Sequence, residues 1–196
     1  TLCLLAYPLP GEPMGAEAQS RVALTEELGA QFEQQLSAIT RHAFVPSTKP
    51  RLTLLPEQEL NAFLRFQGVR HLPPGITDAV VRIGSDDSLT VEAVLDLDTI
   101  RNSRPREWVD PFRYLGGQLT VRATGRAHSG NGVATVEVES VVVAGIAMPV
   151  QVLQEVVRHY TGTPQRPDGA GLNDPIPLPY RIVEVRLSPG LAVIVQ

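Results

Sequence analysis

The sequence predicts an α+β fold with mainly antiparallel strands, and three observations support this prediction. The first is a pattern that occurs twice: an amphipathic helix, a Leu-Pro step and a two-stranded hairpin. The second is a set of strand-like segments in which apolar and polar residues alternate strictly. The third is one long amphipathic segment that precedes all of the strands.

Length and composition are those of one folded domain. The chain has 196 residues, of which 43% are hydrophobic and 19% are charged, which suffices for a sizeable core and argues against disorder. A net charge of −4 gives no electrostatic reason to expect nucleic acid as a partner. We expect a single domain over residues 19–196. Residues 1–18 are expected to be an arm or the remnant of a signal or anchor segment, because the chain opens with an apolar run.

The longest helix is expected over Gln19–Ala43. Leu28, Phe32 and Leu36 fall on one stripe of this segment, and the charged residues lie largely opposite. Pro46 follows closely and cannot continue a helix, because it has no backbone N–H to donate.

The two copies of the repeated pattern follow in order. A strand over Arg51–Leu55 leads into the first copy. Leu60, Phe63 and Leu64 form the buried stripe of its helix. Each hairpin is predicted from period-two alternation, which buries one face and leaves the other in water. The first copy comprises Pro56–Phe66, Ile76–Ile83 and Leu89–Leu97, and the second comprises Pro149–Tyr160, Tyr180–Leu187 and Leu191–Val195.

A central hairpin lies between the two copies. Its turn is expected at Ser129–Gly132, because Asn and Gly tolerate a positive φ. The predicted inward positions are small, and small residues either let a helix approach closely or leave room for an alkyl chain. These positions include Ala123, Gly125, Ala127, Ala134 and Ser140.

No catalytic motif competes with these structural signals. The four histidines are scattered, so they do not have the spacing of a metal site. Asp96 and Asp98 lie two residues apart, a spacing that suits acid–base work but more often belongs to a solvated strand face. We therefore expect no enzymatic activity, no metal and no cofactor.

The segment 99–116 is an insertion between hairpins. It combines four arginines with three aromatic residues, including Arg106 and Trp108. Such a combination suits a phospholipid headgroup layer or an anionic ligand. It equally suits a loop that tucks its aromatic side chains under the core.

Together the long helix, the segment Leu52–Leu64 and the segment from Gly145 into the second-copy helix resemble the tubular lipid-binding (TULIP) superfamily, particularly its small bacterial envelope members. The closing hairpin after Leu178-Pro179 is also similar. The resemblance covers roughly residues 19–196 and is one of architecture and hydrophobic pattern. It implies a strongly curved antiparallel sheet wrapped around a long N-terminal helix, with two shorter helices and lipid held between them.

Two functions follow as expectations. The first is non-enzymatic binding or transfer of a lipid or other long apolar ligand in the bacterial cell envelope. For this function we expect a periplasmic or extracytoplasmic location, an N-terminal membrane anchor and transient contact with the membrane surface. The alternative is a structural or assembly module of an envelope complex, with a solid core and no ligand. The predicted ligand-binding residues are Leu28, Phe32, Leu36, Phe63, Val91, Ala93, Val121, Ala123, Val136 and Val138, with Arg106 and Trp108 at the mouth.

Overall fold

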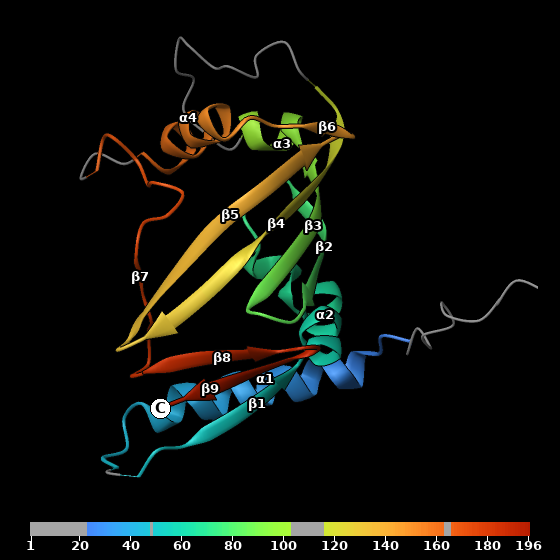
Figure 1. Ribbon diagram of the computed structural model, residues 1–196. Coiled ribbons are helices and arrows are strands. Elements are labelled where there is room, and N and C mark those ends of the chain that lie inside the picture. Colours follow the sequence, from blue (N-terminus) through green and yellow to red (C-terminus); the bar gives the residue numbers. More distant parts are fainter. Residues whose placement is uncertain (1–22, 48, 103–115, 163–165) are drawn as a thin grey trace, which may run out of the picture.

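The chain folds into two antiparallel sheets and four α-helices within the residues that a computed structural model describes, which are 23–47, 49–102, 116–162 and 166–196 (Figure 1). The smaller sheet has the strand order β1-β9-β8. The larger sheet has the order β2-β3-β4-β5-β6, and β7 also pairs with β5. Neither strand order closes on itself. The α+β class and the antiparallel pairing are therefore as predicted.

The helices are α1 (Glu26–His42), α2 (Glu57–Phe66), α3 (Leu97–Asn102) and α4 (Val150–Thr161), with a 3-10 turn over Gly68–His71. The strands are β1 (Leu52–Pro56), β2 (Ile76–Ile83), β3 (Ser88–Asp96), β4 (Gln118–Gly130), β5 (Val133–Val143), β6 (Ile146–Ala147), β7 (Ile176–Pro177), β8 (Glu184–Ser188) and β9 (Leu191–Val195).

Helix α1 begins later than predicted. The expected start at Gln19 lies outside the described residues, but residues 23–25 are described and are not helical. Thr25 is the N-cap, and its hydroxyl accepts a hydrogen bond from the N–H of Leu28 at 3.4 Å. A threonine in this position supplies an acceptor that the first helical turn lacks, so the helix begins at Glu26.

A closed hydrophobic core lies between α1, α2 and the smaller sheet. It consists of Phe32, Ile39, Leu55, Phe63 and Ile194, all of them buried. The rings of Phe32 and Phe63 lie 5.1 Å apart between centroids and are tilted, which is a favourable aromatic arrangement. Figure 1 shows α1 lying along the smaller sheet.

Helices α1 and α2 approach each other closely at Gly29. A Cβ atom at this position would lie 2.0 Å from the side-chain oxygen of Gln67 and 3.1 Å from the backbone of Ala62. The glycine that weakens the helical propensity of α1 is therefore the residue that lets the two helices pack.

The two copies of the repeated pattern lie in different sheets. The first hairpin is β2–β3 of the larger sheet, and the second is β8–β9 of the smaller one. The second hairpin is shorter than predicted, because Tyr180 and Arg181 have positive φ values of 56° and 58° and form a turn. Strand β8 consequently begins at Glu184 rather than at Tyr180.

One side chain connects the two sheets. The hydroxyl of Ser129, near the end of β4, accepts a hydrogen bond from the N–H of Val185 at 2.6 Å and donates one to its carbonyl at 2.9 Å. The N–H of Gly132 donates to the carbonyl of Val183 at 2.9 Å. The tip of the central hairpin is thus fixed to β8.

Candidate ligand-binding face

One face of the larger sheet is apolar across four strands. The register places Val81, Val91, Ala123 and Val141 in one row across β2, β3, β4 and β5. Side chains of directly paired residues share a face, and every second residue of a strand returns to it. We call this surface the apolar face; its residues are Ile76, Val81, Ile83, Leu89, Val91, Ala93, Leu95, Leu119, Val121, Ala123, Gly125, Ala127, Ala134, Val136, Val138, Val141 and Val143.

A β-bulge in β5 changes which residues reach this face. Thr124 pairs with Ser140, but the next residue of β4, Gly125, pairs with Val138, so β5 contains one extra residue. Because the side-chain period of a strand is two, one extra residue reverses the alternation. Ser140 therefore lies opposite Thr124 on the polar face, contrary to the prediction that it points inward, and Val141 takes its place.

Gly125 makes this bulge sterically feasible. A Cβ atom there would lie 2.4 Å from the carbonyl oxygen of Glu137. No real side chain tolerates that distance, so the two strands approach at the bulge only because residue 125 is glycine.

The apolar face is covered at its margins and exposed in its middle. Among its described side chains only Ile83 and Val141 are buried, each 6% exposed, whereas Val91 is 39% exposed. Ile83 lies beside α2, since its N–H donates to the Glu57 carboxylate at 2.6 Å. Val141 lies beside the start of α4, since its carbonyl accepts from the N–H of Met148 at 2.8 Å. The two helices lie toward opposite ends of the larger sheet (Figure 1), and Val91 between them is exposed.

The opposite face of the same sheet is polar. Arg122 and Glu92 form an ion pair at 3.1 Å between neighbouring strands, and Arg126 and Glu139 form a second at 3.1 Å. Arg122, Arg126 and Glu139 are exposed and Glu92 is half-buried, so these pairs add little stability. The ion pairs do show that this face of the sheet, and not the apolar face, is the one suited to contact with water.

Helix α2 closes the free edge of β2. The side-chain amide of Asn61 donates to the carbonyl of Val81 and accepts from its N–H, both at 2.8 Å, as a neighbouring strand would. Sequence reasoning did not single out Asn61 for this role. The available signal was a polar residue between the apolar positions Leu60 and Phe63, on the buried stripe of an amphipathic helix.

The predicted ligand-binding residues that the structure describes fall into two groups. Six of them lie together on the apolar face: Val91, Ala93, Val121, Ala123, Val136 and Val138. Phe32 and Phe63 belong to the closed core, Leu36 packs against that core, and Leu28 is half-buried on α1. Arg106 and Trp108 lie outside the described residues.

The neighbouring carboxylates at the end of β3 have structural partners. Asp96 accepts from the N–H groups of Asp98 and Thr99 at 3.0 and 2.9 Å, and Asp98 accepts from the N–H of Gly117 at 2.9 Å. The hydrogen bond from Thr99 is the main cause that lowers the pKa of Asp96 below its usual range. Asp98 belongs to α3 rather than to the predicted strand face, and Asp96 caps the start of that helix.

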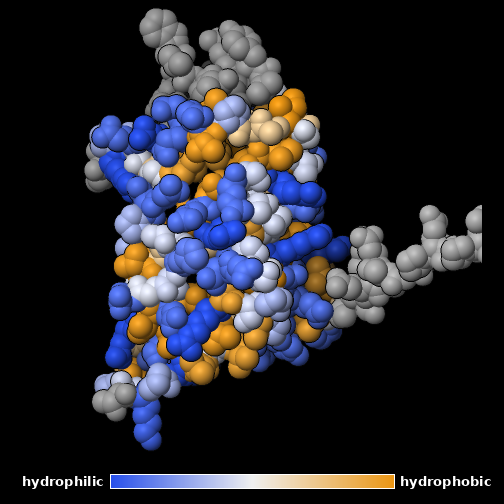
Figure 2. Space-filling view, viewed as in Figure 1, coloured by the Kyte–Doolittle hydropathy of each residue, from blue (hydrophilic) through white to orange (hydrophobic). Residues whose placement is uncertain are grey.

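Hydrophobic surface also gathers at the end of the molecule formed by β6 and α4, as Figure 2 shows. Ile146 is 73% exposed and Val150 is 50% exposed.

In the part of the chain that the structure describes, no three His, Cys, Asp or Glu residues are grouped so that they could hold a metal ion. No helix among these residues is both long and apolar enough to cross a membrane.

Comparisons with protein-family models, with curated proteins and with solved structures find no match to this chain.

Proposed function

We propose that this protein binds a lipid or another long apolar molecule on the apolar face, without catalysing a reaction, as a TULIP-like protein of the bacterial cell envelope. One observation carries the proposal: a wide apolar sheet face is left partly exposed although the chain builds a closed core elsewhere. Exposed contiguous apolar surface of this kind is typical of binding sites.

The energetics of such a complex are favourable without any polar anchor. Burial of apolar surface contributes about 0.8 kcal/mol per CH₂ group, so a long acyl chain gains roughly 10 kcal/mol. That gain offsets association costs of about 4–15 kcal/mol. The small side chains of Ala123 and Ala127 on β4 add little volume to the middle of the face, where a chain would lie.

The experiment combines native mass spectrometry with one substitution. Gentle purification should preserve a lipid adduct on the wild-type protein. Ala123→Leu should leave the melting temperature nearly unchanged, since the site is only half-buried, and should abolish the adduct by filling the space. Thr120→Leu is the matched control, because Thr120 lies on the polar face of the same strand, and it should keep the adduct.

The opposite result identifies a structural module with a solid core. In that case the wild-type mass is free of adduct, and Ala123→Leu destabilises the fold by about 1–3 kcal/mol through overpacking. These two results together would reject the binding proposal.

A further inference from the structure

A groove lies at the opposite end of the molecule from α4. The end of α1, the loop that follows it, the turn of the β4–β5 hairpin and the segment before β8 converge there around Gln196 (Figure 1). They enclose a groove of about 550 Å³. The groove is distinct from the apolar face, because none of its lining residues belongs to that face.

The walls of the groove are fixed to one another by hydrogen bonds. The side-chain amide of Gln196 donates to the carbonyls of Ile39 and Tyr180 at 2.9 and 2.8 Å. The guanidinium of Arg181 donates to the carbonyl of Val45 at 3.3 Å, and the N–H of Leu178 donates to Gly132 at 2.7 Å. A ligand would therefore meet a preformed site and would have little backbone to order.

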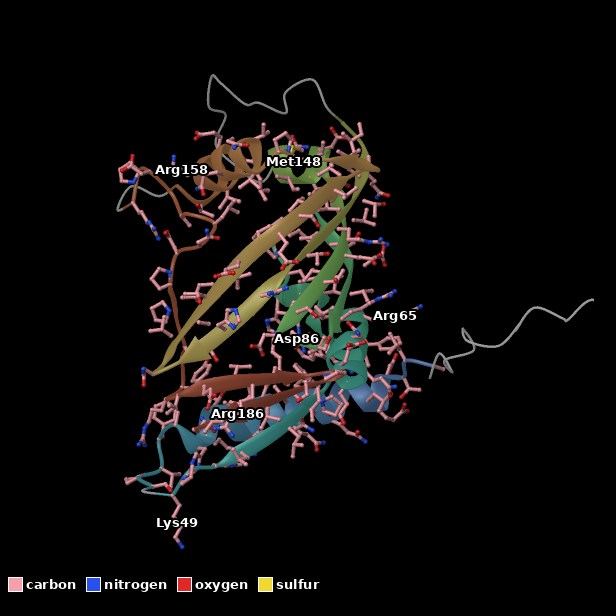
Figure 3. All side chains as sticks on the ribbon, viewed as in Figure 1. Lys49, Arg65, Asp86, Met148, Arg158 and Arg186 are labelled. Atoms are coloured by element: carbon pink, nitrogen blue, oxygen red, sulfur yellow. The ribbon has the colours of Figure 1, made fainter. Side chains whose placement is uncertain are left out.

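The ionisable side chains that line the groove are all basic. His42, Lys49 and Arg181 contribute to the lining, and no acidic side chain does. None of the three takes part in an ion pair with the described residues. Figure 3 shows the Lys49 side chain projecting from the lower end of the molecule, away from the other elements.

The surrounding sequence strengthens this local charge. Residues 34–56 contain no Asp or Glu, although the whole chain has a net charge of −4. Over residues 175–196 the single acidic residue is Glu184, and its carboxylate is paired with Arg186 at 2.8 Å. The groove is thus a positive site on an acidic protein, which favours an anionic ligand through the local field.

The lining also defines which anion fits. A guanidinium and an ammonium are the two side-chain groups that best bind phosphate oxygens. Leu178, Ile182 and Val183 supply an apolar wall beside them, which suits a ligand with carbon atoms next to its charged group. We propose that this groove binds a phosphate ester, either as a free small molecule or as the headgroup of a phospholipid.

The experiment uses two phosphate-bearing probes. Glycerol 3-phosphate is titrated calorimetrically, and vesicles of phosphatidylcholine with and without phosphatidylglycerol are tested by co-sedimentation. A double variant, Lys49→Gln with Arg181→Gln, removes two cations and should weaken binding about tenfold or more. Arg82→Gln is the matched control, because Arg82 is an exposed arginine on β2 with no ion pair to the described residues, and it should bind as the wild type does.

The outcomes separate the two ligand sources. Binding of glycerol 3-phosphate that the double variant loses identifies a soluble phosphate ester. Binding only to phosphatidylglycerol vesicles, again lost in the double variant, identifies a lipid headgroup. The single variant Arg181→Lys retains the charge, so in either case it should keep most of the binding of the wild type.

The proposal is overturned if the folded wild type binds neither probe, or if the double variant binds as tightly as the wild type. The test of the groove is independent of the test of the proposed lipid site on the apolar face. Ala123→Leu should not affect glycerol 3-phosphate binding, and the Lys49/Arg181 variant should keep any acyl-chain adduct on the apolar face.

Discussion

Asn61 is the buried polar side chain of the described residues, at 8% exposure, and it determines how the larger sheet ends. Strand β2 is an outer strand, and an outer strand offers unpaired N–H and C=O groups to any other chain. The amide of Asn61 occupies both groups of Val81, so a side chain of α2 replaces the missing strand.

Asn61→Leu should therefore destabilise the protein. The substitution leaves the N–H and C=O of Val81 without partners, which costs about 2 kcal/mol or more. Chemical denaturation measures the loss. Gln58→Leu, on the exposed side of the same helix, is the control and should have little effect; equal losses in the two variants would contradict the role assigned to Asn61.

Asp96 gives the stability a dependence on pH. Its pKa is lowered in the folded protein from an ordinary value of 3.8, because backbone N–H groups stabilise the ionised form. The stabilising contribution is consequently complete above pH 3.8 and is lost as the pH falls through the lower, folded-state pKa.

Comparison of the wild type with Asp96→Asn isolates this contribution. Asparagine also caps helices but does not titrate, so the variant should lose less stability than the wild type between pH 5 and strongly acidic solution. Thermal unfolding across this range measures the difference. Parallel curves for the two proteins would show that the Asp96 carboxylate is not the titrating cap.

Most helices and strands are predictable from local pattern. The strands over Ile76–Ile83 and Leu191–Val195 have the bounds that alternation predicts, and α2 and α4 begin one residue after the predicted prolines. Local alternation and capping determine these elements, and both are visible in a few consecutive residues.

The bulge in β5 was not predictable, because it depends on a contact between strands. Nothing in the alternation of β5 marks where the extra residue falls; the close approach of Gly125 to Glu137 becomes visible only when β4 and β5 are paired. The same reason explains why sequence reasoning placed Phe32 and Phe63 with Val91 in one layer. Periodicity shows that a side chain is buried but does not show against which sheet.

Gly125→Ala tests the bulge. The added methyl group would lie 2.4 Å from a carbonyl oxygen, so β4 and β5 must separate, at a cost of about 1–3 kcal/mol. Gly130→Ala is a matched control on the same strand, since nothing lies within 4 Å of its Cβ position. Urea denaturation of both variants measures the effect, and a Gly125→Ala protein as stable as Gly130→Ala would refute the steric argument.

The two sheets of the molecule bury their apolar surface to different extents. The smaller sheet, α1 and α2 enclose the closed core, whereas the larger sheet keeps its apolar face half-exposed and is tied to the smaller sheet through Ser129 and the hairpin tip. The repeated helix and hairpin does not produce one continuous layer, because each copy joins a different sheet. Sequence could predict the repeat but not this division, which depends on long-range strand pairing.

The half-exposed apolar face affects the heat capacity of the protein. Unfolding raises the heat capacity in proportion to the apolar surface that becomes newly hydrated, typically by about 12–15 cal/mol/K per residue. The apolar face is already partly hydrated in the folded state, so unfolding adds less new apolar surface than in a fully packed chain of this length. A ligand that covers the face would remove that water, and its binding would carry a negative heat-capacity change.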